Sequence, residues 1–275
     1  MTELPFVKMQ GLGNDFAIFD ARERPLALTA AQMVALADRH RGIGCDQVVV
    51  LEPSARADVR MRIFQPDDGS EVGACGNATR CVARLVGGDV LIETLAGLLR
   101  CRRIGDEIEV DMGPVRTGWQ EVPLAREQDT ARVDLDLGPL NGPACCNVGN
   151  PHATFFVADA ELVDVQGLGP MVERHPLFPE RVNVGFCTVR APDRLRLRMW
   201  ERGVGETQAC GSGACAAVTA AARRGLGARR ATVELDGGPL VVTWRDDDNH
   251  VLMQGPTAFV FAGRIDPAGL EGGGR

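Results

Sequence analysis

The sequence predicts an α+β protein made of two pseudo-symmetric, β-rich domains, each closed around a central helix. Three observations lead to this fold class: an internal repeat, strands in which polar and apolar residues alternate, and one apolar helix after a Gly-rich loop in each half. A chain of 275 residues is long enough for two domains of ordinary size.

The repeat is visible in the residues themselves. The segment GNDFAIF, from Gly13, matches GNPHATF, from Gly149, at an offset of 136 residues. Further matches follow in the same order at offsets of 135 or 136: Asp38-Arg39-His40 with Glu173-Arg174-His175, Gln47 with Asn183, Arg60-Met61-Arg62-Ile63-Phe64 with Arg196-Leu197-Arg198-Met199-Trp200, and Ala74-Cys75-Gly76 with Ala209-Cys210-Gly211. Gly113-Pro114 then matches Gly255-Pro256 at 142. Six ordered matches indicate duplication, so the two halves should share a fold.

We place the N-terminal half at residues 1–117 and the C-terminal half at 118–262. The tail, residues 263–275, matches nothing in the other half, and its Gly-rich end is expected to fray.

Each half has the same expected order of elements. Alternation of period two predicts strands over residues 7–19, 60–64, 107–112, 196–200 and 240–244. The central helices are expected at 77–86, before Gly87-Gly88, and at 212–224, before Gly225. The second helix contains GACAAVTAAA, which is small and apolar on every side, as a helix wrapped by sheet requires.

Composition excludes several classes of function. The net charge of −7 and pI near 5.2, without a basic stripe, argue against a nucleic-acid partner. We expect no membrane partner, because no run is long and apolar enough to span a bilayer, and the first ten residues do not resemble a signal peptide. The expected location is the cytoplasm, where the nine cysteines would stay reduced.

The sequence also points to chemistry without a cofactor. Lys8 is the single lysine, so a pyridoxal-phosphate enzyme would have to form its Schiff base there. No cysteines are spaced as a CxxC pair, which argues against a zinc site. We therefore predict no cofactor and no metal.

Cys75 and Cys210 each lie just before a predicted central helix. Unpaired backbone N–H groups and the helix dipole favour an anion there, and cysteine pKa values at such sites fall from about 8.5 to roughly 3.5–7.5. The sequence therefore predicts two reactive thiols. Cys45 is left undecided, and the remaining cysteines are expected to be buried small hydrophobes: Cys81, Cys101, Cys145, Cys146, Cys187 and Cys215.

Two thiols at equivalent positions suit inversion at a carbon with a weakly acidic hydrogen. With the active site in the cleft between the domains, one thiolate would remove the proton from one face and the other thiol would return a proton to the opposite face. Backbone N–H groups at the helix starts would stabilise charge on the substrate carboxylate. The alternative is that Ala-Cys-Gly recurs only because the ancestral turn needed it for packing.

The chain resembles the diaminopimelate epimerase family. Seven motifs in family order carry the resemblance: Gly11-Leu12-Gly13-Asn14-Asp15-Phe16, Gly42-Ile43-Gly44-Cys45-Asp46-Gln47, Asp68-Gly69-Ser70-Glu71, Ala74-Cys75-Gly76-Asn77-Ala78-Thr79-Arg80-Cys81, Gly149-Asn150-Pro151-His152, Arg181-Val182-Asn183, and Glu201-Arg202-Gly203 through Gly205-Glu206-Thr207-Gln208-Ala209-Cys210-Gly211-Ser212-Gly213. They cover nearly the whole chain.

The resemblance implies cofactor-independent epimerisation of LL-2,6-diaminopimelate to the meso form, in the synthesis of lysine and peptidoglycan precursors. It implies that Cys75 and Cys210 are the acid/base pair, and that His152 and Glu201 tune their pKa values. The substrate-binding residues that it implies are Asn14, Gln47, Gln65, Gly76, Asn77, Asn150, Asn183, Glu201, Arg202, Gly211 and Ser212. A homodimer is compatible with the sequence, which does not determine the oligomeric state.

The position of Gln65 departs from the family pattern. The family usually has Asn shortly before Asp-Gly-Ser-Glu, whereas this chain has one extra residue and reads Gln65-Pro66-Asp67 before Asp68. Counting back from Cys75 puts Pro66 at the Asn position, and the internal repeat, which pairs Gln65 with Glu201, favours Gln65.

Three other functions compete with this interpretation. A racemase of another amino acid, including proline racemase or hydroxyproline epimerase, also has paired cysteines, but proline has no distal amino-acid head for Glu201 and Arg202 to bind. A non-catalytic amino-acid-binding relative would not need both thiols. A cysteine hydrolase would use one thiol with a histidine, and leave the second thiol without a role.

Overall fold

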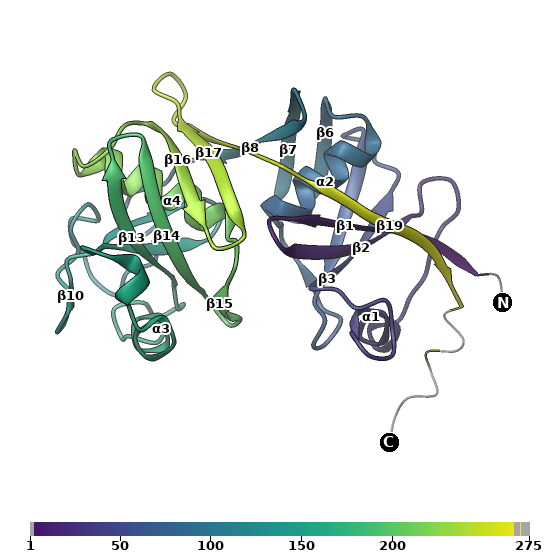
Figure 1. Cartoon of the computed structure of the whole chain (residues 1–275), viewed down its shortest axis with the longest axis horizontal. Coiled ribbons are helices and arrows are strands. Elements are labelled where there is room, and N and C mark those ends of the chain that lie inside the picture. Colours follow the sequence, from purple (N-terminus) through teal and green to yellow (C-terminus); the bar gives the residue numbers. More distant parts are fainter. Residues whose placement is uncertain (1–2, 267–269, 271–275) are drawn as a thin grey trace. The chain divides into compact units, whose positions relative to one another are not determined.

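The computed structural model describes residues 3–266 and residue 270, and it divides into two compact units (Figure 1). Unit 1 runs to Val110 and takes up the chain again from Gly255. Unit 2 comprises residues 111–254. Both units are mostly sheet with few helices, so the α+β fold with two related domains is confirmed.

The elements of unit 1 follow in chain order: β1 (Leu4–Gly11), β2 (Asn14–Asp20), α1 (Ala30–Ala37), β3 (Gln47–Glu52), β4 (Val59–Phe64), β5 (Glu71–Val72), α2 (Gly76–Val86), β6 (Val90–Thr94), β7 (Gly97–Ile104), β8 (Glu107–Pro114), whose last residues enter unit 2, and β19 (Ala258–Ile265).

The elements of unit 2 are β9 (Asp136–Leu137), β10 (Leu140–Asn141), β11 (Ala144–Asn147), β12 (Pro151–Phe156), the 3₁₀ helix η1 (Ala160–Leu162), α3 (Val165–Glu173), β13 (Asn183–Ala191), β14 (Arg194–Glu201), β15 (Gly205–Thr207), α4 (Gly211–Arg223), β16 (Arg230–Leu235), β17 (Gly238–Trp244) and β18 (His250–Gly255).

Strand register confirms the duplication. In unit 1, β2 and β3 are parallel with Phe16 opposite Gln47, and in unit 2, β12 and β13 are parallel with His152 opposite Asn183. Each of these four residues is 136 positions from its counterpart. The parallel pairs β4–β6 and β14–β16 repeat the arrangement further along the chain.

The sheet of each unit surrounds its central helix, α2 or α4 (Figure 1). In α4 the side chains of residues 213–221 are all buried, as the apolar sequence predicts. Helix α2 is buried over residues 77–83 and includes the polar side chains of Asn77, Thr79 and Arg80. The helices begin and end within one residue of the predicted positions, and Gly87 and Gly225 follow them with φ of 142° and 66°.

The strands predicted over residues 7–19 are present as β1 and β2, and Leu12 and Gly13, with φ of 57° and 85°, turn the chain between them. The prediction of one helix in each half was wrong, because each unit also contains a second helix, α1 or α3, at equivalent places in the repeat. A capping box at Thr29 and Gln32 marks the start of α1 and was the missed signal.

The units differ from the predicted halves at their ends. After Gly113-Pro114 the chain forms a bridge from Arg116 to Asn147 in unit 2, and after Gly255-Pro256 it returns as β19 beside β1. Residues 255–262 therefore belong with unit 1. Residues 263–265, expected in a tail, pair with residues 4–6. The predicted fraying concerns the Gly-rich end of the tail, most of which lies outside the described residues.

None of the helices in the described part of the chain is long and apolar enough to cross a membrane.

Candidate functional site

Cys75 and Cys210 occupy the same place in their units, as predicted. Each is the N-cap of the central helix, with extended backbone angles of φ −142° and ψ 115° for Cys75, and φ −115° and ψ 108° for Cys210. Each N-cap leaves the first backbone N–H groups of its helix without acceptors inside the helix. Both thiols therefore lie beside backbone N–H groups that can bind an anion.

The Cys210 thiol is buried, with 4% of the residue exposed. Its Sγ accepts from the Gly213 N–H at 3.4 Å and lies 3.5 Å from Ser212 Oγ. Burial raises the pKa of Cys210 well above its ordinary value, and the charge of Glu201 raises it further. The helix start predicted a lowered pKa; this prediction was wrong for Cys210, because loss of water outweighs the hydrogen bonds from Ser212 and Gly213.

A chain of polar contacts leads away from Cys210. Ser212 Oγ lies 3.0 Å from His152 Nε2, which is also 2.9 Å from Asn150 Oδ1. His152 is 1% exposed, and burial, followed by the charge of Arg202, lowers its pKa to about 3. The imidazole is therefore neutral near pH 7. Since Asn150 Oδ1 only accepts, Nε2 carries the proton.

Glu201 is the last residue of β14, and the turn that follows separates it from β15. The Thr207 hydroxyl donates to Glu201 Oε1 at 2.6 Å. Burial raises the pKa of Glu201, which brings its protonated form closer to neutral pH. Positive φ at Gly203 and Gly205, 76° and 115°, allows the chain to leave strand geometry.

The turn that carries Arg202 is held on two sides. Asn183 is 3% exposed; its Oδ1 accepts from the Arg202 backbone N–H at 2.9 Å, and its Nδ2 donates to Pro151 O at 2.9 Å. The buried Glu173 carboxylate accepts from Gly203 N at 3.1 Å and from Trp200 Nε1 at 2.7 Å. Asn183 was predicted to bind substrate, and in this structure its amide positions the turn.

The Arg202 side chain itself is exposed, and its Nη1 donates to Glu180 O at 3.0 Å.

In unit 1 the Cys75 thiol lies 3.6 Å from Asn14 Oδ1, which also accepts from Asn77 Nδ2 at 3.2 Å. Asn14 Nδ2 in turn donates to Asp46 Oδ2 at 2.9 Å. Asn14, Cys75 and Asn77 are thus brought together. Asp46 was missed by sequence reasoning, although it stands beside Gln47 in the GIGCDQ motif.

Gln47 begins β3, and its Oε1 is buried without a hydrogen-bond partner among the described residues. An unsatisfied buried acceptor is costly, so this atom is suited to a donor group of a ligand.

Gln65 directly follows β4, as Glu201 ends β14. Phe64 is opposite Glu71 and Trp200 is opposite Glu206, which supports the equivalence of Gln65 and Glu201.

The single lysine is already engaged. Lys8 is buried, and its Nζ pairs with Asp15 Oδ2 at 2.6 Å and donates to Gly44 O. Arg39 binds the same Asp15 carboxylate through both of its terminal nitrogens. A Schiff base at Lys8 would break this buried pair.

The other cysteines lie in the core. Burial raises the pKa of Cys45 to about 11, and the pKa values of Cys81, Cys101, Cys146 and Cys187 to about 12. Cys145 and Cys215 are also buried. The prediction of buried small hydrophobes is confirmed for all six, and Cys45 joins them. Among the described residues, no group of three or more His, Cys, Asp or Glu side chains could hold a metal ion.

Comparison with known proteins identifies the family. The family model for diaminopimelate epimerase matches residues 6–118 and 144–260. The diaminopimelate epimerase of Acidiphilium cryptum is 55% identical over 272 residues, which cover 97% of this chain and 98% of that protein.

Two solved structures share the fold. A phenazine biosynthesis protein of the PhzF family from Enterococcus faecalis is 14% identical, with a TM-score of 0.70, over 96% of this chain and 100% of that one. A hydroxyproline epimerase from Agrobacterium vitis, with bound trans-4-hydroxy-L-proline, is 16% identical, with a TM-score of 0.66, over 98% of this chain and 94% of that one. These likenesses concern the fold, whereas the family match and the 55% identity extend along almost the whole sequence. The chain belongs to the diaminopimelate epimerase family.

Proposed function

We propose that this protein interconverts LL-2,6-diaminopimelate and meso-diaminopimelate by a two-cysteine acid/base mechanism that uses no cofactor. The observation that carries the proposal is the equivalent placement of Cys75 and Cys210, each as the N-cap of the central helix of a duplicated unit. The family match supports the substrate. The product serves the synthesis of lysine and of peptidoglycan precursors.

In the proposed reaction, one thiolate takes the α-proton from one face of the substrate carbon, and the other thiol gives a proton to the opposite face. The C–H electron pair moves toward the carboxylate as the proton leaves, and it forms the new C–H bond when the second proton arrives. Burial raises the pKa of Cys210, so its thiol keeps its proton in this structure. The acid of the pair must be protonated in this way. In the reverse direction the two roles exchange.

The charge that develops on the carboxylate must be stabilised by hydrogen-bond donors. We assign this role to backbone N–H groups at the starts of the two helices, from Gly76 and Asn77 in α2 and from Gly211 and Ser212 in α4. Donors of this kind are fixed before the reaction begins, so they stabilise the transition state without reorganising.

Neighbouring side chains would tune Cys210. Ser212 and the neutral His152 provide a hydrogen-bonded path that stabilises its thiolate, whereas the charge of Glu201 stabilises its thiol. The hydrogen bond from Ser212 therefore partly offsets the effects of burial and of Glu201, and it makes the thiolate easier to form, which a reversible proton transfer requires.

The remaining polar groups suit an amino-acid ligand with two heads. We propose that Gln47 Oε1, the buried acceptor, takes a donor group of the substrate, together with Asn14, Asn150 and Gln65. Glu201 and Arg202 would bind the distal ammonium and carboxylate, respectively. Asn183 would act by holding the Arg202 backbone.

The test is a screen for exchange of the α-hydrogen with D2O over diaminopimelate, lysine, alanine, proline and trans-4-hydroxy-L-proline. The proposal predicts exchange and inversion of diaminopimelate, with lysine a very poor substrate. Preferred turnover of proline or hydroxyproline would instead favour the activity named for the Agrobacterium vitis relative. Exchange with no amino acid in the panel would favour a non-catalytic binding protein.

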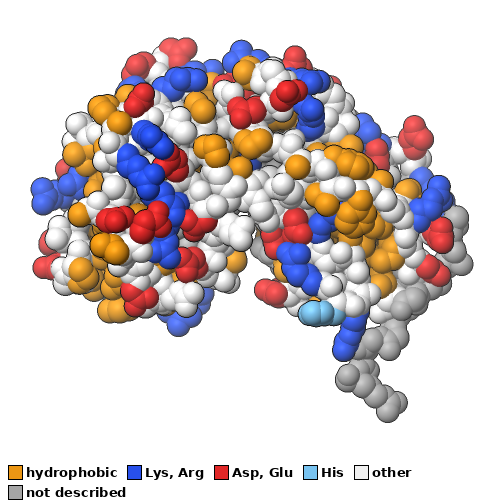
Figure 2. All heavy atoms as spheres, in the orientation of Figure 1, with side chains coloured by type: hydrophobic (Ala, Val, Ile, Leu, Met, Phe, Trp, Pro, Cys, Tyr) orange, Lys and Arg blue, Asp and Glu red, His pale blue; other side chains and the backbone are white. Residues whose placement is uncertain are grey.

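We also propose a homodimer formed through β19. Phe259, Val260 and Phe261 are adjacent on this strand and are 61%, 51% and 44% exposed. Figure 2 shows hydrophobic side chains gathered on this face of unit 1. Because a long, exposed apolar edge strand invites pairing with another chain, a second copy is the expected cover. Light scattering should give twice the monomer mass for the wild type and the monomer mass for Phe261→Asp; a monomeric wild type would disprove it.

A further inference from the structure

The segment that leads to each cysteine begins with a very short strand. Before Cys75 it is β5, which pairs with β4 at only two positions, and before Cys210 it is β15, which pairs with β14 at three. So few backbone pairs leave the position of the following thiol weakly fixed. Contacts outside these short ladders must fix the segment further.

An arginine–glutamate pair is present at this place in both units. In unit 1, Arg62 Nη2 lies 2.7 Å from Glu71 Oε2, and Arg62 Nε lies 3.1 Å from Glu71 Oε1. In unit 2, Arg198 Nη2 lies 2.5 Å from Glu206 Oε1. Each glutamate is four residues before its cysteine.

The register of the two pairs is also the same. Glu71 is opposite Phe64 and Glu206 is opposite Trp200, and each arginine lies two residues earlier on the same strand face. Arginine and glutamate are therefore diagonal neighbours across the ladder, within reach of long side chains. The arginines are 136 residues apart and the glutamates 135, the offsets of the whole repeat.

A second contact is duplicated closer to each thiol. The Ala96 N–H donates to Gly73 O at 3.0 Å, and the Gly237 N–H donates to Gln208 O at 2.9 Å. Both carbonyls are two residues before a cysteine, and both donors lie in the turn of the hairpin that follows the central helix. Each cysteine segment is thus fixed at the same two points.

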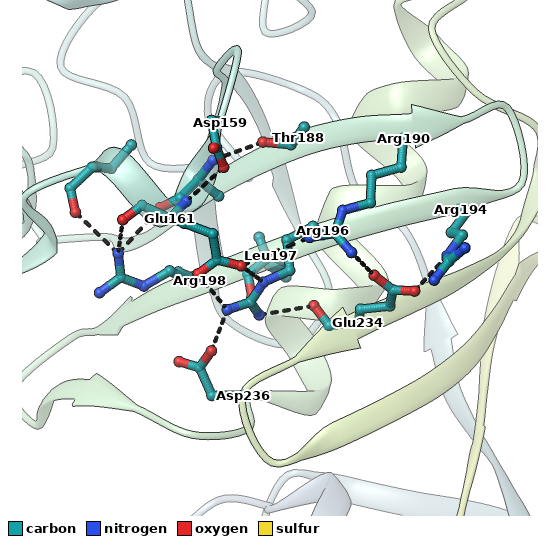
Figure 3. A network of polar contacts seen from close by, with 12 residues as sticks. Asp159, Glu161, Thr188, Arg190, Arg194, Arg196, Leu197, Arg198, Glu234 and Asp236 are labelled. Carbon is teal, nitrogen blue, oxygen red and sulfur yellow. Dashed lines mark hydrogen bonds and ion pairs between the residues drawn. The ribbon is translucent and has the colours of Figure 1, made fainter.

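Each arginine of these pairs makes further contacts that hold its side chain. Arg62 also pairs with Glu52 at 3.2 Å, and its guanidinium stacks over the Phe64 ring. Figure 3 shows Arg198 reaching the η1 segment, where Nη1 donates to Ala160 O and Val163 O at 3.1 and 3.0 Å.

The neighbouring duplicated arginines do not serve the same purpose. Arg196 binds Glu161 and Asp236 (Figure 3), and Arg60 is 3.9 Å from Glu52, so neither is placed on a cysteine segment.

We propose that the Arg62–Glu71 and Arg198–Glu206 pairs are positioning residues, each holding the segment that places Cys75 or Cys210 for proton transfer. The intervening residues differ in sequence and length between the units, six in residues 65–70 and five in 201–205, yet both pairs are kept. Retention of the same contact beside two different turns indicates selection for what the segments share, which is the thiol. The kinetic part of this inference rests on the proposed function.

The experiment compares Glu71→Leu and Glu206→Leu with Glu109→Leu. The control breaks a similar cross-strand pair, Arg102 Nη2 to Glu109 Oε1 at 2.7 Å, which lies on β7 and β8 rather than on a cysteine segment. Each Leu change has a matched Gln variant, which keeps an oxygen that can accept from the arginine. If a Leu variant does not fold, Arg62→Lys or Arg198→Lys replaces it, since lysine cannot form the two parallel bonds.

We expect Glu71→Leu and Glu206→Leu to lower kcat for diaminopimelate by about tenfold to 100-fold, the scale of a misplaced reacting group, with KM changed less than about threefold. The Gln variants should recover most of the loss, and Glu109→Leu should keep kcat within about twofold of the wild type, as a surface pair predicts.

Thiol alkylation, followed by mass spectrometry, gives a readout independent of activity. Glu71→Leu should change the rate at Cys75 and leave Cys210 unaffected, whereas Glu206→Leu should speed the reaction of the buried Cys210 and leave Cys75 unaffected.

The inference is wrong if the Leu variants match the Glu109→Leu control, if Gln is as damaging as Leu, or if both thiols change together. A wild type without epimerase activity would refute the proposed function alone, because the alkylation rates would still decide whether each pair positions its own cysteine.

Discussion

Ser212→Ala tests the contact between Cys210 and its nearest side-chain donor. Ser212 Oγ lies 3.5 Å from Cys210 Sγ, and this hydrogen bond favours the thiolate. The variant also loses the contact between Ser212 Oγ and His152 Nε2 at 3.0 Å, but His152 keeps its bond to Asn150 at 2.9 Å. The substitution leaves the backbone N–H of residue 212 in place.

The size of the effect follows from the geometry. A hydrogen bond to a charged group contributes about 1.5–3 kcal/mol, and a contact as long as 3.5 Å belongs at the lower end, so kcat/KM should fall about tenfold. Because the equilibrium between the two isomers does not change, the fall must be equal in both directions.

The pH dependence has a definite sign. Ser212 lowers the pKa of Cys210, so its removal raises that pKa further, and the limb of the kcat/KM profile that reports the Cys210 thiolate should move to higher pH. Ser54→Ala, which removes a hydroxyl bound to Glu93, is the control and should leave the profile unchanged. An unchanged kcat/KM for Ser212→Ala, or a shift to lower pH, would refute this account of Cys210.

Two further predictions concern other residues of unit 2. The pKa of His152 is lowered from 6.5 to about 3, so the unfolded chain binds the extra proton first as the pH falls. The free energy of unfolding should therefore drop by up to about 1.4 kcal/mol per pH unit between about pH 6.5 and 3. Urea titrations of His152→Gln should show a correspondingly weaker dependence of the unfolding free energy on pH. An equal slope in both proteins would exclude a buried neutral His152. Arg202→Met should lower kcat/KM for diaminopimelate about tenfold or more, because the variant loses a charged hydrogen bond to the distal carboxylate. The free energy of unfolding should change little, because the Arg202 side chain is exposed. Steady-state kinetics that match the wild type would show that Arg202 does not bind the substrate.

Sequence patterns predicted the parts of the fold that depend on local order. The 136-residue offset gave the duplication, and the apolar run near residue 213 gave a helix that is buried on all sides. Cysteine at an N-cap is also a local property, and it was found in both units.

The missed features depend on long-range contacts. The pairing of β19 with β1 joins the two ends of the chain, and no periodicity of either strand encodes the partner. The pKa of Cys210 depends on its burial and on the charge of Glu201 at the end of β14. Together these raise the pKa more than the start of the helix lowers it. Asp46 acts through Asn14, so its role is visible only once β2 and β3 are side by side.

The central claim is that two different thiols act on the two faces of one carbon. Its most direct test is the first turnover of LL-diaminopimelate in D2O, with isotope analysis of both the product and the unreacted substrate. The account predicts meso product that carries deuterium at the inverted carbon, early recovered substrate that keeps its protium, and loss of inversion in both Cys75→Ala and Cys210→Ala. Product that retains the original α-protium, or inversion at the wild-type rate in either variant, would contradict it.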